Sequence, residues 1–365
     1  MSRRVRVFGI LLTVALLFGG LAYSSQVQAV GTSLTTSPVS VNLTGKAGQT
    51  VTTTLQVQNN SANALKIAIQ LDTFHAQGTA GKAAITPPTS NDTFISWVHF
   101  SQTSFIAQPG AWTPVTMTIN LPTSASLGYY YAVLFKPVES FATSTPNTNF
   151  ITGSNTVLVL LNTVSANEKP RLQVASFTAS KKVYEYLPAT FNIDVRNSGN
   201  IYLPPSGDIY ITKGSGLNNV IATLDINPGA GNVLPSSDRA FSVQWANGFP
   251  VFEPKQANGQ PLTNKAGQPV EQLHWNFAQA SHFRFGHYYA HLTLVYSNGT
   301  QDIPINGIVS FWVIPWKLIL IILVPLALIV FALWSIIRKI YKRIRKIIHK
   351  KTKPEVTQPK DEDKV

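Results

Sequence analysis

Three histidines lie close together towards the C-terminal end of the chain, at His282, His287 and His291. Imidazole nitrogens are common zinc ligands, so this group is the first candidate for chemistry. If the segment is a β-strand, His287 and His291 share a face but lie about 13 Å apart, because each residue advances about 3.3 Å. Zinc holds its ligand atoms within about 2.1 Å. The spacing therefore predicts no metal site, and nothing else in the sequence suggests a bound cofactor.

Motifs for catalysis are also missing from the sequence. It contains no HExxH, no GxSxG and no calcium loop rich in Asp and Asn. It has no cysteine, which excludes a thiolate nucleophile and disulfides. Twelve acidic residues are scattered over residues 30–314 and suggest no pair for general acid–base work. We expect a protein that is not an enzyme; two carboxylates converging in a cleft would instead indicate an envelope hydrolase.

The better functional candidate is an aromatic group in a segment rich in Pro, Gly, Asn and Gln, at about residues 246–284. The group comprises Phe249, Phe252, His274, Trp275 and Phe277. Long loops on a rigid scaffold often carry recognition, and aromatic side chains dominate interface energetics. One hypothesis is therefore a partner-binding surface. The other, which the sequence supports equally, is that these rings fold back as a small core over the edge of the domain.

A repeated element contributes tyrosines: Gly128-Tyr129-Tyr130-Tyr131-Ala132 recurs as Gly286-His287-Tyr288-Tyr289-Ala290. Tyrosine rings can stack on sugars. However, a tyrosine that opens the penultimate strand of a sandwich commonly ties its hydroxyl to nearby backbone. We favour this structural role over sugar binding.

The elements that would position these residues are short β-strands. Apolar residues alternate with polar ones in many runs, such as residues 65–71, 115–121 and 191–195. Such alternation places one face of each strand against a core. Turn-forming residues separate the runs, and between the two hydrophobic ends no stretch sustains a helical period for three turns. The pattern predicts an all-β protein with two tandem immunoglobulin-like β-sandwiches.

The chain also repeats itself, which suggests the domain boundaries. Besides the tyrosine element, the strand end Val57-Gln58-Asn59-Asn60-Ser61 matches Val195-Arg196-Asn197-Ser198-Gly199. We therefore expect two copies of one module, residues 30–166 and 167–314. The second copy would carry the extra segment of about 246–284.

Hydrophobic segments at the two ends predict export and anchoring. Residues 1–29 combine a basic start, a short apolar run and a small-residue cleavage pattern, as in a signal peptide; an uncleaved membrane helix is the alternative. Residues 315–337 include an uncharged run of twenty, enough to span a hydrocarbon core of roughly 30 Å. Nine Lys and Arg follow within residues 338–353 and predict a basic cytoplasmic tail, residues 338–365, with residues 30–314 outside the cell. The residues expected at the membrane interfaces are Trp312, Trp316, Lys317, Trp334, Arg338 and Lys339.

The net charge of +13 is concentrated at the two ends of the chain. Residues 30–314 carry 14 basic and 12 acidic side chains, whereas residues 315–365 carry 12 and 4. A nearly neutral body offers no surface that follows a phosphate backbone, so we exclude nucleic acid as a partner. The basic tail also has apolar residues at helical spacing, which would suit a helix lying on anionic lipid. We favour the simpler interpretation, a stop-transfer signal.

With a signal segment, two sandwiches, one membrane helix and a basic tail, the chain resembles the WxL-interacting surface proteins of Gram-positive bacteria. In residues, the resemblance rests on Ser37-Pro38, the turn at Gly48, Asn59-Asn60-Ser61, Pro109-Gly110, and Pro122 leading to Gly128-Tyr129-Tyr130. It implies peptidoglycan binding by the first domain and binding of a host or partner protein by the second. The family's Asn- and Tyr-rich segment early in the first domain is not evident in this sequence.

Two hypotheses for function follow. The main one is a non-enzymatic, membrane-anchored cell-surface protein that binds cell-wall polymer or a partner surface protein. The alternative is a structural or assembly subunit, or chaperone, of an envelope complex that binds its partners by strand addition at an exposed sheet edge. Stoichiometric membrane partners that co-purify with the chain would favour the alternative.

Overall fold

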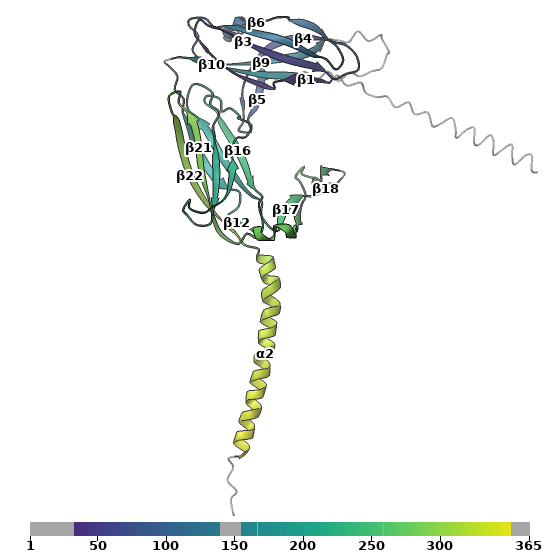
Figure 1. The fold of residues 1–365 in the computed structure, drawn as a ribbon, viewed down its shortest axis with the longest axis vertical. Coiled ribbons are helices and arrows are strands. Elements are labelled where there is room, and N and C mark those ends of the chain that lie inside the picture. The colour runs from purple at the N-terminus through teal and green to yellow at the C-terminus, as the bar shows by residue number, and fades with distance from the viewer. Residues whose placement is uncertain (1–32, 139–154, 166, 258, 352–365) are drawn as a thin grey trace, which may run out of the picture. The chain divides into compact units, whose positions relative to one another are not determined.

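A computed structural model describes residues 33–138, 155–165, 167–257 and 259–351, with side chains up to residue 344 (Figure 1). The signal peptide predicted for residues 1–29 and the end of the predicted tail, residues 352–365, lie outside the described residues. The described chain forms two compact units. The first runs to Leu172 and also includes residues 196–203 and 232–239; the second holds the rest, including the C-terminal helix.

The first unit contains a sandwich of two β-sheets. One sheet has the order β1-β3-β8-β6, with bounds Leu34–Ser37, Thr50–Asn59, Trp112–Asn120 and Val98–Phe100. The other has the order β2-β10-β9-β4-β5, with bounds Ser40–Lys46, Asn155–Val164, Leu127–Val138, Leu65–Gln77 and Lys82–Thr86; β7 (Ser104–Ala107) also pairs with β4. A short 3-10 helix, η1 (Thr93–Trp97), precedes β6.

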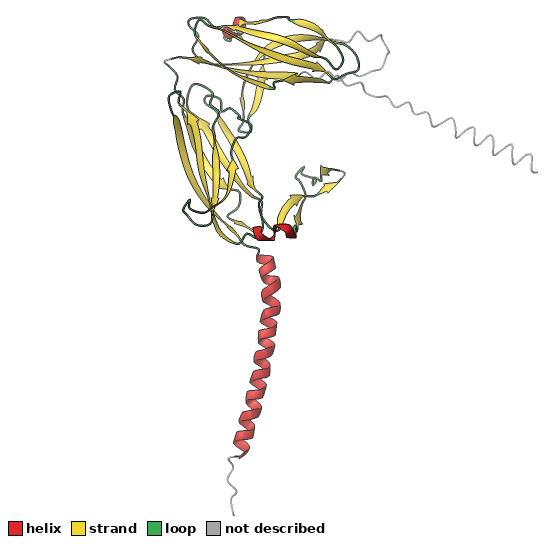
Figure 2. Cartoon of the chain, viewed as in Figure 1, coloured by secondary structure: helices red, strands yellow, loops and turns green. Residues whose placement is uncertain are grey.

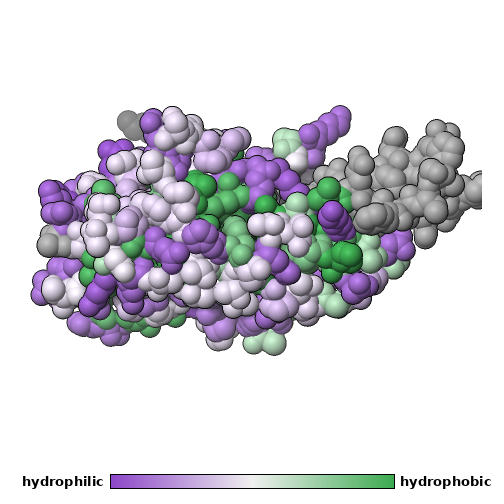
Figure 3. All heavy atoms as spheres, turned by 90° about the horizontal axis from the view of Figure 1, so that it is seen from above, coloured by the Kyte–Doolittle hydropathy of each residue, from purple (hydrophilic) through white to green (hydrophobic). Residues whose placement is uncertain are grey.

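The core of this sandwich follows from the alternation of side chains along the strands. Every second residue of β8 is fully buried, at Val115, Met117 and Ile119. The facing sheet contributes alternate residues of β9, including Tyr131 and Phe135. The residues between the buried positions of β8, Thr116 and Thr118, are half-buried. The face of the molecule seen in Figure 3 is mainly hydrophilic, with hydrophobic patches. The predicted β-sandwich is confirmed.

Two neighbouring strands, β4 and β9, depart from simple alternation. In β9 every residue from Tyr131 to Phe135 is buried. Along β4 the buried positions pass from Leu65 and Ile67 to Asp72 and Phe74, which lie on the opposite face. Phe74 packs there in a second, smaller cluster with Ala132, Leu134, Leu160 and Tyr202 of the same unit. Both faces of this sheet are therefore buried in part, a feature that the alternation in residues 65–71 did not indicate.

The second unit contains most of a second sandwich, whose strands follow the same order but without counterparts of β6 and β7. The sheet β11-β13-β16 has the bounds Leu172–Ala179, Ala189–Asn197 and Asp238–Trp245. The sheet β12-β22-β21-β14-β15 has the bounds Val183–Tyr184, Asp302–Val313, Gly286–Ser297, Ser206–Thr212 and Val220–Asp225. In both sandwiches an early strand pairs in parallel with the last one, β2 with β10 and β12 with β22. This shared topology is the immunoglobulin-like arrangement predicted from the sequence; the exact boundaries at 30–166 and 167–314 stay a prediction.

The matched strand ends of the sequence have one structural cause. Asn59 is fully buried, and its Nδ2 donates to the carbonyls of Asn63, at 2.7 Å, and Ala107, at 3.0 Å. Asn197 is equally buried, and its Nδ2 donates to the carbonyls of Ile201 and Val233, both at 2.8 Å. Each asparagine ties the turn after its strand to a distant segment of the chain, the end of β7 for Asn59 and the loop at Val233 for Asn197, which explains why the two short motifs are alike.

The chain ends in the helix α2 (Trp316–Lys351), shown in red in Figure 2. Residues 316–344 are long and apolar enough to cross a membrane by length and composition, and their most apolar window is not buried by the protein. The helix extends beyond the predicted span, 315–337, into the basic segment. Only Ile314 and Pro315 separate it from β22.

Candidate functional site

Residues 246–285, between β16 and β21, form an appendage to the second sandwich, whereas residues 121–126 make the equivalent connection in the first. The appendage is a hairpin of β17 (Val251–Pro254) and β20 (Glu271–His274), a smaller pair β18 (Gln256–Ala257) and β19 (Gln260–Pro261), and the 3-10 helix η2 (Phe277–His282). Two backbone hydrogen bonds fasten its parts: Phe252 N donates to Leu187 O at 2.8 Å, and Phe249 N donates to His282 O at 3.0 Å. The side chain of Asn276 caps η2 by accepting from Ala278 N.

Four of the five aromatic residues predicted for partner binding come together. The rings of Phe249, Trp275 and Phe277 contact one another at centroid distances of 5.4 to 6.2 Å. Phe252 and Trp275 both contact the ring of Tyr186, at 6.0 and 6.4 Å. We call these five rings the aromatic cluster. His274 stands apart from it, with its Nδ1 4.0 Å from a carboxylate oxygen of Glu253.

The cluster has packed rings, as the small-core hypothesis expects, and exposed rings, as the partner-binding hypothesis needs. Phe249 and Phe252 are half-buried and pack as a small core. Trp275 is 42% exposed and Phe277 is 74% exposed, so the outer rings remain accessible. Binding of a partner by these residues stays a prediction.

A hollow of about 490 Å³ lies between the cluster and the start of α2. Its lining includes Tyr186, Phe252, Glu271 and Trp316. Glu185, another lining residue, accepts a hydrogen bond from Lys317 Nζ at 2.8 Å. Burial raises the pKa of the Tyr186 hydroxyl above its ordinary value, and the neighbouring Glu185 carboxylate raises that pKa further.

The residues predicted at the membrane interfaces lie at and along α2. Trp312 is exposed on β22 and stacks on His287, with centroids 4.5 Å apart. Trp316 opens the helix, and Lys317 Nζ lies 5.4 Å from its ring. Further along, the guanidinium of Arg338 lies 5.2 Å from the ring of Trp334, and Lys339 is exposed.

The histidines near β21 have other neighbours. His291 Nε2 lies 3.0 Å from Thr212 Oγ1, and burial lowers the pKa of this imidazole. His287 stacks on Trp312. Within the described ranges there is no group of three or more His, Asp or Glu side chains that could hold a metal ion.

The tyrosines of the repeated element serve the framework. Tyr129 accepts a hydrogen bond from the backbone N–H of Ser126 at 3.0 Å, the structural role favoured above. Tyr131 is fully buried in the core, and burial raises the pKa of its hydroxyl far above the ordinary value.

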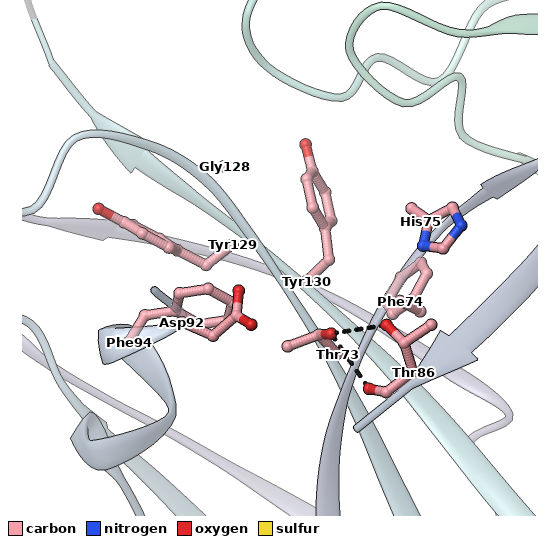
Figure 4. A pocket seen from close by; sticks show the side chains of 9 residues that line it. All are labelled: Thr73, Phe74, His75, Thr86, Asp92, Phe94, Gly128, Tyr129 and Tyr130. Carbon is pink, nitrogen blue, oxygen red and sulfur yellow. Dashed lines mark hydrogen bonds between the residues drawn. The ribbon is translucent and has the colours of Figure 1, made fainter. Parts of the chain in front are cut away.

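The first sandwich has a hollow of about 370 Å³ that the sequence did not indicate (Figure 4). Tyr129, Phe94 and Asp92 lie on one side of it, His75, Phe74 and Thr86 on the other, and Tyr130 stands between them. The carboxylate of Asp92 accepts from the N–H and hydroxyl of Thr89 at 2.7 and 2.8 Å, and these bonds hold its pKa below the usual range. The hollow therefore presents an ionised carboxylate beside aromatic rings.

An open sheet edge is the second feature that sequence reasoning did not locate. The edge strand β15 pairs with β14 on one side, and no described strand pairs with its other side. Ile226 N donates to Gly207 O, and hydrogen-bonded residues alternate along an antiparallel pair, so Leu224 also bonds to β14. The N–H and C=O groups of Thr223 and Asp225 therefore point away from the sheet. The alternation in residues 220–225 marks a strand, but only the fold shows that it is an edge.

Comparisons with known proteins concern the fold. No protein-family model matches the sequence, and no curated protein matches it. Among solved structures, the class 5 fimbriae chaperone CfaA is similar with a TM-score of 0.35 and 16% identity over 76% of this chain and 99% of that one. The Salmonella enterica complex of the SafA pilin with the SafB chaperone gives a TM-score of 0.34 and 10% identity over 76% and 96%. The E. coli chaperone DraB gives 0.32 and 8% over 77% and 98%. At these values the similarity carries no argument about function.

Proposed function

We propose that this chain is a membrane-anchored binding protein whose second sandwich takes up an extended segment of a partner protein by strand addition. The anchor would be α2, which follows β22 after two residues. The sandwiches would then face outwards from the cell, as the basic residues after the span predict.

The open edge of β15 is the observation that carries the proposal. Outward-pointing N–H and C=O groups at Thr223 and Asp225 can form the main-chain hydrogen bonds of an added strand. Proteins usually protect such edges with Lys, Pro or a covering segment. β15 contains no Lys, Arg or Pro, and no described segment pairs with its outer side. β15 ends in one charged residue, Asp225, and the edge strand β11 has none, whereas β16 begins with Asp238 and Arg239, the first of which is ion-paired with Arg196.

The substitution Thr223→Pro tests this edge without breaking the sheet. Proline removes an N–H that points outwards, a position where edge strands tolerate it. The matched control is Thr223→Ala, which keeps the N–H. One lost backbone hydrogen bond is worth about 0.5–1.5 kcal/mol, so Thr223→Pro should weaken partner binding by roughly 2- to 10-fold, and more if the ring obstructs the incoming strand.

The assay is co-purification from detergent-solubilised membranes, with partners quantified by mass spectrometry. We expect a stoichiometric membrane or surface protein to accompany the native chain and Thr223→Ala but to be depleted with Thr223→Pro. Equal recovery with both variants would reject β15 as the binding edge. Recovery of no stoichiometric protein with the native chain would reject strand addition altogether.

The hollow in Figure 4 favours a second candidate function, binding of cell-wall polymer by the first sandwich. A carboxylate beside aromatic rings suits hydrogen bonding and stacking with sugars. Peptidoglycan is the polymer that the family resemblance implies. Sedimentation with isolated cell wall tests this: the native chain should sediment and Asp92→Asn should do so less, whereas no sedimentation of the native chain would reject it.

A further inference from the structure

The exposed aromatic side chains of the second unit are gathered at one end of its sandwich. Outside α2, the exposed Trp and Phe residues of the described part of this unit are Trp275, Phe277, Phe283, Phe285 and Trp312. Trp316, the first residue of α2, is 50% exposed and continues the group. We call these six residues the aromatic face.

The strand register shows that the face lies level with the start of α2. Gly286 pairs with Val313, and His287 pairs with Trp312. Phe285 therefore stands beside the last residues of β22, immediately before the chain enters the helix. A backbone bridge between Phe249 and Phe283 and the bond from Phe249 N to His282 O hold η2, and with it Phe277, at the same end.

Basic side chains flank the aromatic face. The carbonyl of Lys182 accepts from the N–H of Trp312, which places the backbones of these two residues side by side. Lys213 lies next to Gly286, with its Cε 3.4 Å from the position a Cβ would take there. Arg284 lies between Phe283 and Phe285 in the chain, but its Nε donates to Asn247 O at 3.0 Å and its guanidinium lies 5.5 Å from the ring of Trp245. Lys317 follows Trp316. Of the nearby acids, Glu185 is paired with Lys317, and Glu271 lines the same hollow as Trp316.

We propose that the aromatic face inserts into the interfacial layer of the bilayer that α2 crosses and that the flanking cations contact anionic lipid headgroups. Trp prefers this layer because its ring can lie among the upper acyl chains while its N–H remains hydrated. Phe beside it contributes apolar area that is buried at the boundary between headgroups and acyl chains. Lys and Arg beside them gain from the negative surface potential. The bilayer is the occupant because α2 begins within a few residues of the face, so every membrane-inserted copy brings these rings to a lipid surface. The inference rests on the membrane anchor proposed above.

The absence of cysteine makes a site-specific test direct, since single cysteines can be introduced and spin-labelled. The full chain is reconstituted in nanodiscs of phosphatidylcholine and phosphatidylglycerol. Labels are placed at Phe277→Cys and at Gln279→Cys, an exposed position that leaves Phe277 intact. Gln301→Cys is the aqueous control: it lies in the turn at the far end of β21 and β22, about 36 Å along the strand from Gly286. Leu328→Cys, within α2, reports on the anchor itself.

Collision of each label with oxygen and with a water-soluble nickel chelate measures its depth. We expect the labels at 277 and 279 to collide more with oxygen and less with nickel than the label at 301. If the label at 328 is lipid-exposed but those at 277 and 279 resemble 301, the inference fails while the anchor stands. If 328 is also aqueous, the anchor itself fails. Protection of 277 from both reagents would indicate a protein partner and overturn the lipid assignment. Equal depth in pure phosphatidylcholine would reject the role of anionic headgroups.

Discussion

The substitution Asn59→Asp tests how a single buried amide fastens the first sandwich. Asn59 has no exposed surface, and its Nδ2 donates two hydrogen bonds, to Asn63 O and Ala107 O. Its Oδ1 accepts from the backbone N–H of Ser61 at 3.0 Å. Aspartate has nearly the same shape and keeps that acceptor, but when ionised it has no donor. Two buried carbonyls would then lose their partner and face a carboxylate oxygen.

The size of the loss follows from those two contacts. Each orphaned buried polar group costs about 1–3 kcal/mol, so the free energy of unfolding should fall by about 2–6 kcal/mol at neutral pH. The introduced carboxyl is buried among carbonyl oxygens, which raises its folded-state pKa above the unfolded value of about 3.9. Below the unfolded-state pKa the carboxyl is neutral in both states and can donate one hydrogen bond in the folded protein, so the variant loses least stability there. The loss in free energy of unfolding should therefore increase as pH rises from the unfolded-state pKa to the folded-state pKa.

Hydrogen exchange of the full chain in nanodiscs measures this effect strand by strand. The amides of β3 and β8 should exchange faster in Asn59→Asp, and those of the second sandwich should not change. The neighbouring substitution Asn60→Asp is the matched control, because Asn60 is exposed and its side-chain Nδ2 donates to another exposed group, Thr35 Oγ1; the bond from Asn60 N to Ser33 O belongs to the backbone and is kept. Equal exchange in the two variants at neutral pH would refute the argument that the buried amide fastens the turn after β3 to the end of β7.

Two further predictions concern the core and backbone packing. Gly207→Ala should destabilise β14 and β21 by about 3 kcal/mol or more, because a Cβ at Gly207 would lie 2.1 Å from the carbonyl oxygen of Thr293. The control is Gly216→Ala, whose Cβ would meet no atom within 4 Å. In the same exchange experiment its stability should stay within about 0.5 kcal/mol of the native chain. Because burial raises the pKa of Tyr131, the stability it contributes should be complete below the ordinary tyrosine pKa of about 10 and be lost as pH rises above it. Its hydroxyl has no hydrogen-bond partner, so Tyr131→Phe should be neutral or stabilising and should reduce the alkaline loss in chemical denaturation; a destabilised Phe variant would contradict this.

Much of the fold could be predicted because its determinants are local. Alternation in residues 115–121 correctly gave the buried face of β8, since strand side chains alternate whatever the strand pairs with. The likeness of the motifs around Asn59 and Asn197 pointed to a repeated structural feature, and the two buried amides supply its physical basis. Four of the five aromatic residues singled out in segment 246–284 meet in space, whereas their binding of a partner stays a prediction.

The features that sequence reasoning did not locate depend on contacts between distant segments. Whether residues 220–225 form an edge or a central strand is decided by β14, β21 and β22, which their own alternation does not specify. The hollow beside Asp92 requires β4, β5, β9 and η1 to converge, and no spacing along the chain indicates that convergence. For the same reason, the sequence could not divide the aromatic segment into packed rings, such as Phe252, and exposed ones, such as Phe277.

Residue-resolved hydrogen exchange of β15, with and without the co-purified partner, tests the central proposal most directly. The outward N–H groups of Thr223 and Asp225 should exchange freely in the isolated chain and become protected in the complex, while Leu224, already bonded to β14, should change less. Unchanged exchange at Thr223 and Asp225 in the complex, with protection at β11 or elsewhere instead, would contradict strand addition at this edge.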